Sequence, residues 1–158
     1  MASEATKQKV SPTWSGPDLA RRRAWPEAFA AAEEVLRADP QHLGALEVRA
    51  QAMLGLGQFE ELFVELRTLV RMNPHEPAYE IWRASALQSM GKVSEAISAL
   101  ARGYSRTKDK SLKRKIVIEL ELLAEFVQGP TKDQLLAEIG LMGSDGKRQN
   151  RVSPNHLS

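Results

Sequence analysis

Few residues in this sequence combine the types and the spacing that catalysis or metal binding requires. The chain has 158 residues and no cysteine, which excludes disulfides, thiolate zinc sites, iron–sulfur clusters and cysteine nucleophiles. It has three histidines, and a zinc site built on His42 and His75 would still need a third ligand. We therefore expect these two histidines to be exposed loop residues, and we expect no metal or other cofactor.

The motifs that usually mark an enzyme are missing from the sequence. It contains no G-x-S-x-G nucleophile elbow, no phosphate-binding glycine loop and no H-E-x-x-H zinc motif. Gly55 and Gly57 indicate the end of a helix rather than a phosphate cradle, because no strand precedes them. We predict a protein that is not an enzyme, whose chemistry is that of binding.

Charge and hydrophobicity limit the classes of partner. Lys and Arg number 22 and Asp and Glu number 20, so the net charge is +2, too small to predict a nucleic-acid-binding surface. The basic runs Arg21–Arg23 and Lys108–Lys115 lack interleaved aromatic residues, and we expect solvated charge there. No apolar stretch approaches the length of about 18 residues that predicts a membrane span. The N-terminal residues have no apolar signal-peptide core, which together with the lack of cysteine favours a cytoplasmic protein.

The elements that would position a binding surface come from an internal repeat. When it is shifted by 34 residues, the sequence aligns with itself at small, apolar and turn residues. The aligned residues include Arg49 with Arg83, Ala50 with Ala84, Gly57 with Gly91, Pro40 with Pro74, and the set Trp25, Phe59 and Val93. Because each unit has two segments of helical spacing separated by a glycine, the period predicts an all-α row of helical hairpins.

The repeat also sets the expected boundaries. We predict a helical domain over 18–142, which comprises a half-repeat at 18–42, full repeats at 43–76 and 77–110, and capping helices over 110–142. The expected helices cover about 25–38, 44–56, 59–72, 78–90, 94–106 with Ser94 as N-cap, 110–127 and 131–142, after a short turn near 18–23. The polar ends, 1–17 and 143–158, are expected to be disordered tails.

With these residues in register, the chain resembles the tetratricopeptide repeat family over about residues 24–128. The full repeat 43–76 carries the family's order of residues in Leu46, Arg49, Ala50, Met53, Gly57, Phe59, Leu62, Leu66, Leu69 and Pro74. The chain departs from the family at Leu62 in this repeat, where the family has a small residue, and at Gly103 in the next, where the family has an alanine. The resemblance implies a short right-handed α-solenoid that binds other proteins.

The resemblance also implies where a partner would bind, because the first helices of such hairpins line the concave face. The corresponding residues are Glu47, Val48 and Gln51, then Ile81, Trp82 and Ser85, then Lys115, Ile116 and Glu119. Val48 and Trp82 stand where family members that grip a terminal carboxylate have asparagine or a cation, so no carboxylate clamp is expected. We expect an apolar strip instead, with Gln51 and Ser85 bonding to the backbone of a peptide or amphipathic helix of another protein.

Two alternatives stay open in the sequence. Trp82 is either an exposed anchor for the partner or a core residue beneath a neighbouring helix. The last helix, 131–142, has an apolar stripe of Leu135, Leu136, Ile139 and Met142, and it either caps the last repeat or inserts into the groove of its own chain or of a second copy.

The predicted function is a non-catalytic adaptor, scaffold or co-chaperone-like subunit. The alternative is a self-assembling structural subunit such as a homodimer.

Overall fold

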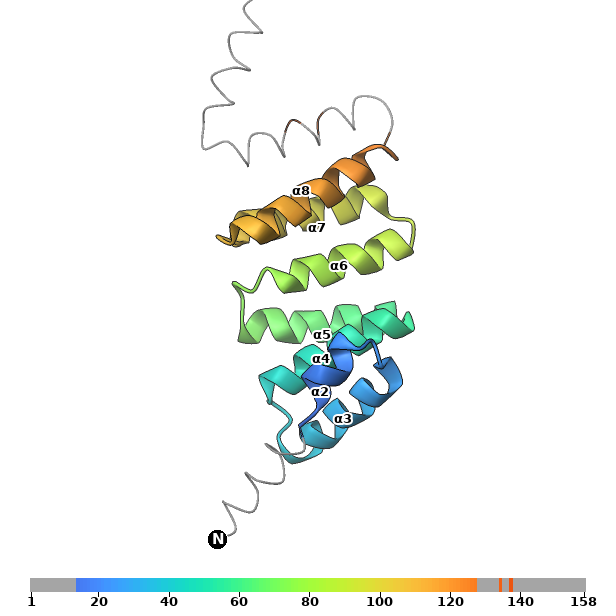
Figure 1. Ribbon diagram of the computed structural model, residues 1–158, viewed down its shortest axis with the longest axis vertical. Coiled ribbons are helices and arrows are strands. Elements are labelled where there is room, and N and C mark those ends of the chain that lie inside the picture. Colours follow the sequence, from blue (N-terminus) through green and yellow to red (C-terminus); the bar gives the residue numbers. More distant parts are fainter. Residues whose placement is uncertain (1–13, 128–133, 135–136, 138–158) are drawn as a thin grey trace, which may run out of the picture. The chain divides into compact units, whose positions relative to one another are not determined.

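The computed structural model of the chain describes residues 14–127, 134 and 137 (Figure 1). This part of the chain contains seven helices and no strand, and neighbouring helices pack against one another as in a helical repeat. The prediction of an all-α fold is therefore confirmed. Of the predicted helix 131–142 only residues 134 and 137 are described, and both are helical and exposed. The tail 143–158 and residues 1–13 of the other tail lie outside the described residues.

The chain divides into two compact units at Pro74, close to the predicted boundary between the two full repeats. The first unit contains α2 (Gly16–Arg21), α3 (Trp25–Ala38), α4 (Leu43–Leu56) and α5 (Phe59–Met72). Within it, α4 packs against α2, α3 and α5. The second unit contains α6 (Ala78–Ser89), α7 (Val93–Arg106) and α8 (Lys110–Ala124), in which α7 packs against both α6 and α8.

Glycines end the first helix of each full repeat, as the sequence predicts. Gly57 follows α4 with φ of +76°, and Gly91 stands at the equivalent turn with φ of +78°. Each allows the next amide to turn back onto the helix, since Gln58 N donates to Met53 O and Lys92 N donates to Leu87 O, both at 2.8 Å. This is the hydrogen bond of a Schellman motif, in which the residue that follows the helix has a left-handed backbone conformation.

Several of the expected boundaries are wrong. The helix expected over 110–127 ends at Ala124, where a turn follows α8. Gly16 and Pro17, assigned to the N-terminal tail, open α2, where proline is favourable because the first helical amides lack partners in any case. Ser94, expected to cap α7, lies inside the helix, which begins at Val93 after Lys92. No side chain caps that end of α7, so packing of its apolar face fixes where the helix starts.

Each unit has its own core of buried apolar side chains. In the first unit Ala50 of α4 and Leu62 of α5 are fully buried, which matches the expected crossing of a hairpin. In the second unit the largest buried side chains are Tyr79, Ile97, Leu120 and Leu123. These cores fix the positions of α6, α7 and α8, which carry the candidate site.

Candidate functional site

A groove opens in the second unit between α6 and α8, and α7 forms its floor. Its volume is about 260 Å³. The lining residues are Ile81, Ala84, Ser85 and Gln88 of α6, Leu100 of α7, and Leu112, Lys115, Ile116 and Glu119 of α8. The residues from α6 and those from α8 each recur every three or four positions, so each set lies on one face of its helix.

The floor of the groove is apolar and its rim is polar. Leu100 and Ile116 are buried at the bottom, and Ile81 and Leu112 are half-buried beside them. Gln88 and Lys115 are exposed, and Glu119 is half-buried. An apolar floor with a few polar groups around it is the usual composition of a site that buries part of a ligand.

Ser85 has only part of its hydrogen-bonding capacity left for a ligand. Its hydroxyl donates to the carbonyl oxygen of Ile81, one turn earlier on α6, at 3.1 Å. The proton is thereby used within the helix, while the oxygen can still accept. A partner would therefore have to donate to Ser85.

Five of the nine residues expected to bind a partner line this groove, namely Ile81, Ser85, Lys115, Ile116 and Glu119. The other four do not line it. Glu47, Val48 and Gln51 belong to α4 in the first unit, and Trp82 belongs to α6 outside the groove lining.

Val48 was expected to be an exposed apolar residue of the binding surface, and this expectation is wrong. It is 4% exposed and belongs to the core of the first unit. The reason is that three helices surround α4, so buried residues occur all round it, whereas Glu47 and Gln51 remain half-buried. A repeat register identifies which residues are equivalent but does not show how many neighbours each helix has.

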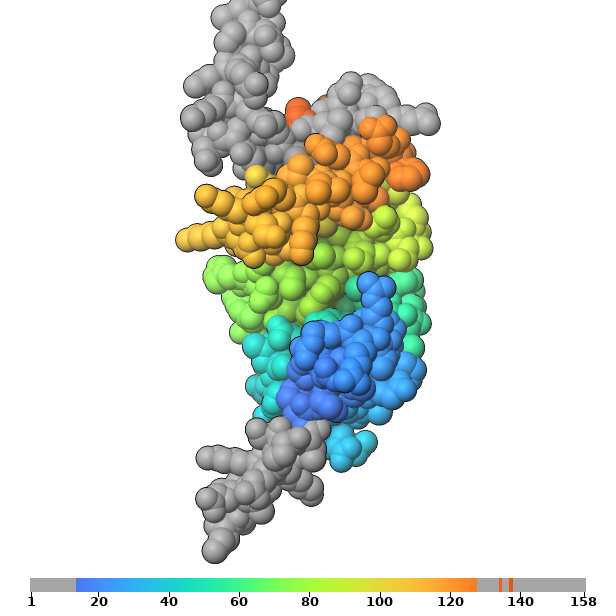
Figure 2. Space-filling view, viewed as in Figure 1, coloured from blue at the N-terminus to red at the C-terminus, as the bar shows by residue number. Residues whose placement is uncertain are grey.

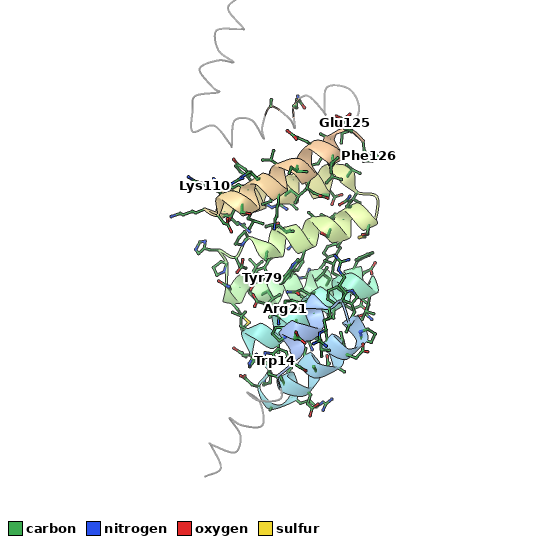
Figure 3. All side chains as sticks on the ribbon, viewed as in Figure 1. Trp14, Arg21, Tyr79, Lys110, Glu125 and Phe126 are labelled. Carbon is green, nitrogen blue, oxygen red and sulfur yellow. The ribbon has the colours of Figure 1, made fainter. Side chains whose placement is uncertain are left out.

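Trp82 is half-buried and packs beside another aromatic ring. Its ring centroid lies 5.5 Å from that of Tyr79, with the two planes tilted by 47°. Tyr79 is fully buried in the core of the second unit, and Figure 3 labels it on α6. Trp82 thus has one side supported by the core, and it is one residue away from Ile81 of the groove.

The first unit contains an ion-pair network that the sequence analysis missed. Arg49 of α4 donates through Nε and Nη2 to both carboxylate oxygens of Glu65 on α5, at 2.6 and 2.9 Å. Its Nη1 donates to Glu33 of α3 at 2.8 Å. The hydrogen bonds to Glu65 are the largest cause of a raised pKa of Arg49, and burial acts in the opposite direction. The available signal was the spacing, because Glu33, Arg49 and Glu65 are each 16 residues apart.

His42 was expected to be an exposed loop residue, and it is a helix cap instead. Its Nδ1 accepts a hydrogen bond from Ala45 N at 3.0 Å, which satisfies one of the free amides at the start of α4. The ring also meets the indole of Trp14 edge-on, with centroids 5.7 Å apart. His75 is exposed, and no three metal-ligating side chains come together among the residues that the structure describes.

The two basic runs have partners close by. Arg21 and Arg22 are exposed and both reach Asp18, at 3.3 and 3.0 Å. Lys113 of α8 lies 4.8 Å from the ring centroid of Tyr104 on α7, a cation–π contact that joins the two helices.

Comparison with known proteins shows the family to which this chain belongs. The model of the family described as bacterial transcriptional activator domain matches residues 8–118, which is more than half of the chain. The chain belongs to this family. No curated protein and no solved structure gives a significant match.

This membership corrects the family assignment expected from the sequence, which holds for the superfamily and not for the family. The bacterial transcriptional activator domain is a helical, repeat-like domain of the tetratricopeptide-like superfamily, and the match is to this domain and not to the tetratricopeptide repeat itself. The matched residues include all of α6 and α7 and the first half of α8. Within the described residues, no helix is long and apolar enough to span a membrane.

Proposed function

We propose that this domain is a non-catalytic docking module of the transcription-activator type, which receives a helix or extended peptide of another protein in the groove between α6 and α8. The observation that carries the proposal is the groove itself, because three helices bring an apolar floor together with a polar rim. The family supports a setting in bacterial transcriptional regulation, which agrees with the expected cytoplasmic location.

The chemistry of the groove favours a protein partner over a nucleic acid. Phosphate backbones are bound by clusters of cations, whereas this rim carries one lysine, Lys115, and one glutamate, Glu119. A partner that places apolar side chains over Leu100 and Ile116 would gain most of its binding free energy from burying them. An acidic residue near Lys115 and a donor facing Ser85 would complete its recognition.

The test is to fill the groove and to follow a captured protein. Ser85→Arg places a long charged side chain in the groove, where it covers apolar surface that a partner would need. We expect native pull-down with quantitative mass spectrometry to show a protein retained by the unaltered chain and lost from Ser85→Arg. Binding of the purified partner should then weaken at least about tenfold, the effect of roughly 1.4 kcal/mol.

Ser98→Arg is the matched control. Ser98 lies on α7 outside the groove, is exposed, and makes the same kind of hydrogen bond, from its hydroxyl to the carbonyl oxygen of Ser94 at 3.2 Å. It should retain the partner, and circular dichroism should show both variants folded. Equal capture by all three baits would contradict the groove as the docking site.

A second function, self-assembly, is favoured by a different surface of the second unit. Ile118, Leu122 and Phe126 follow one another at four-residue spacing along α8 and just beyond its end, and they are 57%, 59% and 74% exposed. Figure 2 shows the atoms of α8 at the surface of the second unit. Large apolar residues gathered on one exposed face are typical of a surface that packs against another protein, here a second copy.

The charges of α8 support pairing with a second copy in antiparallel orientation. Its first half carries Lys110, Lys113, Arg114 and Lys115, and the part from Glu119 onward carries Glu119, Glu121 and Glu125. Figure 3 labels Lys110 and Glu125 near the two ends of this segment. Cations near a helix N-terminus interact unfavourably with the helix dipole, so this order of charges does not stabilise an isolated α8. In an antiparallel pair, each basic half would face the acidic half of the other copy.

A further inference from the structure

The second unit contains a buried carboxylate surrounded by three arginines. Glu80 lies in the first turn of α6, and its side chain is 7% exposed. Arg106 of α7 donates from Nη1 to Glu80 Oε2 at 2.8 Å. The Nε atoms of Arg102 on α7 and Arg83 on α6 lie 3.3 and 3.6 Å from Glu80 Oε1.

Positive charge exceeds negative charge in this cluster. Three guanidinium groups face one carboxylate, which leaves a surplus of two positive charges. Glu80 Oε1 is buried and accepts no hydrogen bond, so Arg83 and Arg102 are attracted to it by charge alone. Among the described residues, Glu80 is the acid that the side chains of all three arginines share. The arginine side chains are between 27% and 48% exposed, so they are open to a ligand.

The repeat shows that this surplus is particular to the second hairpin. In the first unit Arg49 is bound by two acids, Glu33 and Glu65, so that network has more negative than positive charge. One repeat later, Arg83 replaces Arg49, but Arg67 stands at the position of Glu33 and Ala99 at that of Glu65. Arg83 therefore has no acidic residue at either of the two repeat positions that bind Arg49.

We propose that Arg83, Arg102 and Arg106, gathered around Glu80, form an oxyanion-binding site for an acidic segment of a partner protein. Glu80 keeps three like-charged groups close together, and an incoming carboxylate or phosphate group would neutralise the remaining charge. Arginine suits this ligand because its planar donors match the two oxygens of a carboxylate or phosphate. Glu80, Arg83, Arg102 and Arg106 do not line the groove, so the site is independent of the proposed groove function.

The site is tested with labelled peptides and the full chain. One peptide contains six glutamates, a second has glutamines in their place, and a third has phosphoserines, so that carboxylate and phosphate sources are told apart by fluorescence anisotropy. We expect the intact chain to bind one or both acidic peptides but not the glutamine peptide. Arg102→Gln/Arg106→Gln should weaken that binding by about tenfold per arginine, the effect of losing a hydrogen bond to a charged group.

Two control variants separate a built site from general attraction between charges. Arg37→Gln/Arg71→Gln removes two exposed arginines from the last turns of α3 and α5, so it lowers the net charge equally. It should leave binding within about twofold, since exposed charges outside the cluster are largely screened at physiological salt. Arg102→Lys/Arg106→Lys keeps the charge and should still weaken binding, because lysine lacks the planar fork.

Three results would overturn the proposal. The first is that the folded intact chain binds neither acidic peptide. The second is equal loss of binding in the Arg37/Arg71 control, which would reduce the effect to net charge. The third is tighter binding of a DNA duplex than of either peptide through the same arginines, which would assign the site to nucleic acid.

Discussion

Gly55 and Gly103 both lie inside helices, where glycine is unfavourable, but their surroundings differ. A Cβ at Gly55 in α4 would overlap the indole ring of Trp25, which packs from α3 onto the backbone at that point. A Cβ at Gly103 in α7 would lie 3.5 Å from Glu80 Cβ and 3.6 Å from Pro77 O, which are ordinary contacts. Only Gly55 is therefore required by packing.

Alanine at these two positions should change stability in opposite directions. We expect Gly103→Ala to raise the free energy of unfolding by about 0.5–1 kcal/mol, because alanine loses less backbone entropy in a helix. Gly55→Ala should lower it by about 1–3 kcal/mol, because the indole ring must move out of its place. Urea unfolding followed by circular dichroism measures both, and a shift in the same direction for both variants would contradict this account.

Residue identity alone predicted the turns better than it predicted the polar contacts. Gly57 and Gly91 were predictable because a left-handed helix end has few alternatives to glycine. The pairing of Glu80 with Arg102 and Arg106 was not, because these residues are 22 and 26 positions apart and only the packing of α6 on α7 brings them together. The same applies to Trp14 and His42, whose contact depends on where α2 lies.

Among the described helices, α8 has the N-terminal cap with the most side-chain hydrogen bonds. Asp109 accepts hydrogen bonds from Ser111 N at 2.8 Å and from Leu112 N at 3.3 Å. Its negative charge also offsets the unfavourable cations in the first half of α8. Because Leu112 and Lys115 lie within two turns of this cap and form one wall of the groove, the cap helps to position the site.

Asp109→Ala should destabilise the chain by about 1 kcal/mol, the usual cost of losing an N-cap. We expect the amides of Ser111 and Leu112 to exchange hydrogen faster, while those of α4 in the first unit keep their rates. Asp109→Asn keeps an oxygen acceptor at the same position, so most of the stability should return. Unchanged exchange at Ser111 and Leu112 in Asp109→Ala would show that packing on α7 alone holds this end of the helix.

The helices themselves were largely predictable, and their ends were less so. The ranges of α3 and α5 agree with those expected, because each contains a strong 3.6-residue pattern. Gly57 and Pro74 bound α5, whereas α3 has Pro26 in its first turn and Pro40 after its end. The start of α7 was misplaced by one residue because Ser94 is a favourable cap type, while packing of α7 between α6 and α8 determined the result. Propensity is a weak term beside such burial.

At the scale of the whole molecule, the division at Pro74 limits what a sequence repeat can reveal about a binding surface. The expected site combined residues from three successive repeats, whereas the groove is built within the second unit alone. Its α8 wall reaches Glu119, one residue beyond the family match, and the apolar face of α8 extends further through Leu122 and Phe126. Both candidate surfaces of α8 thus include residues beyond the end of the family match.

This apolar face allows the self-assembly function to be tested on the full chain. In an antiparallel pair of α8 helices centred near Leu120, Ile118 of one copy would meet Leu122 of the other, and Lys115 would approach Glu125. We expect sedimentation equilibrium to show a mass that rises from monomer toward dimer with concentration. Raised salt should weaken the dimer through screening of the facing charges.

Leu122→Glu should abolish the dimer, because it places four carboxylates between 119 and 125 of each copy and removes an apolar contact from the centre of the pair. Val64→Glu makes a similar change at a matched site, since Val64 on α5 of the first unit is 55% exposed and Leu122 is 59% exposed. It should leave the dimer intact. A monomeric mass at every concentration, or equal loss in both variants, would contradict pairing through α8. In that case Lys115, which the dimer would partly cover, stays available at the rim of the groove for another protein.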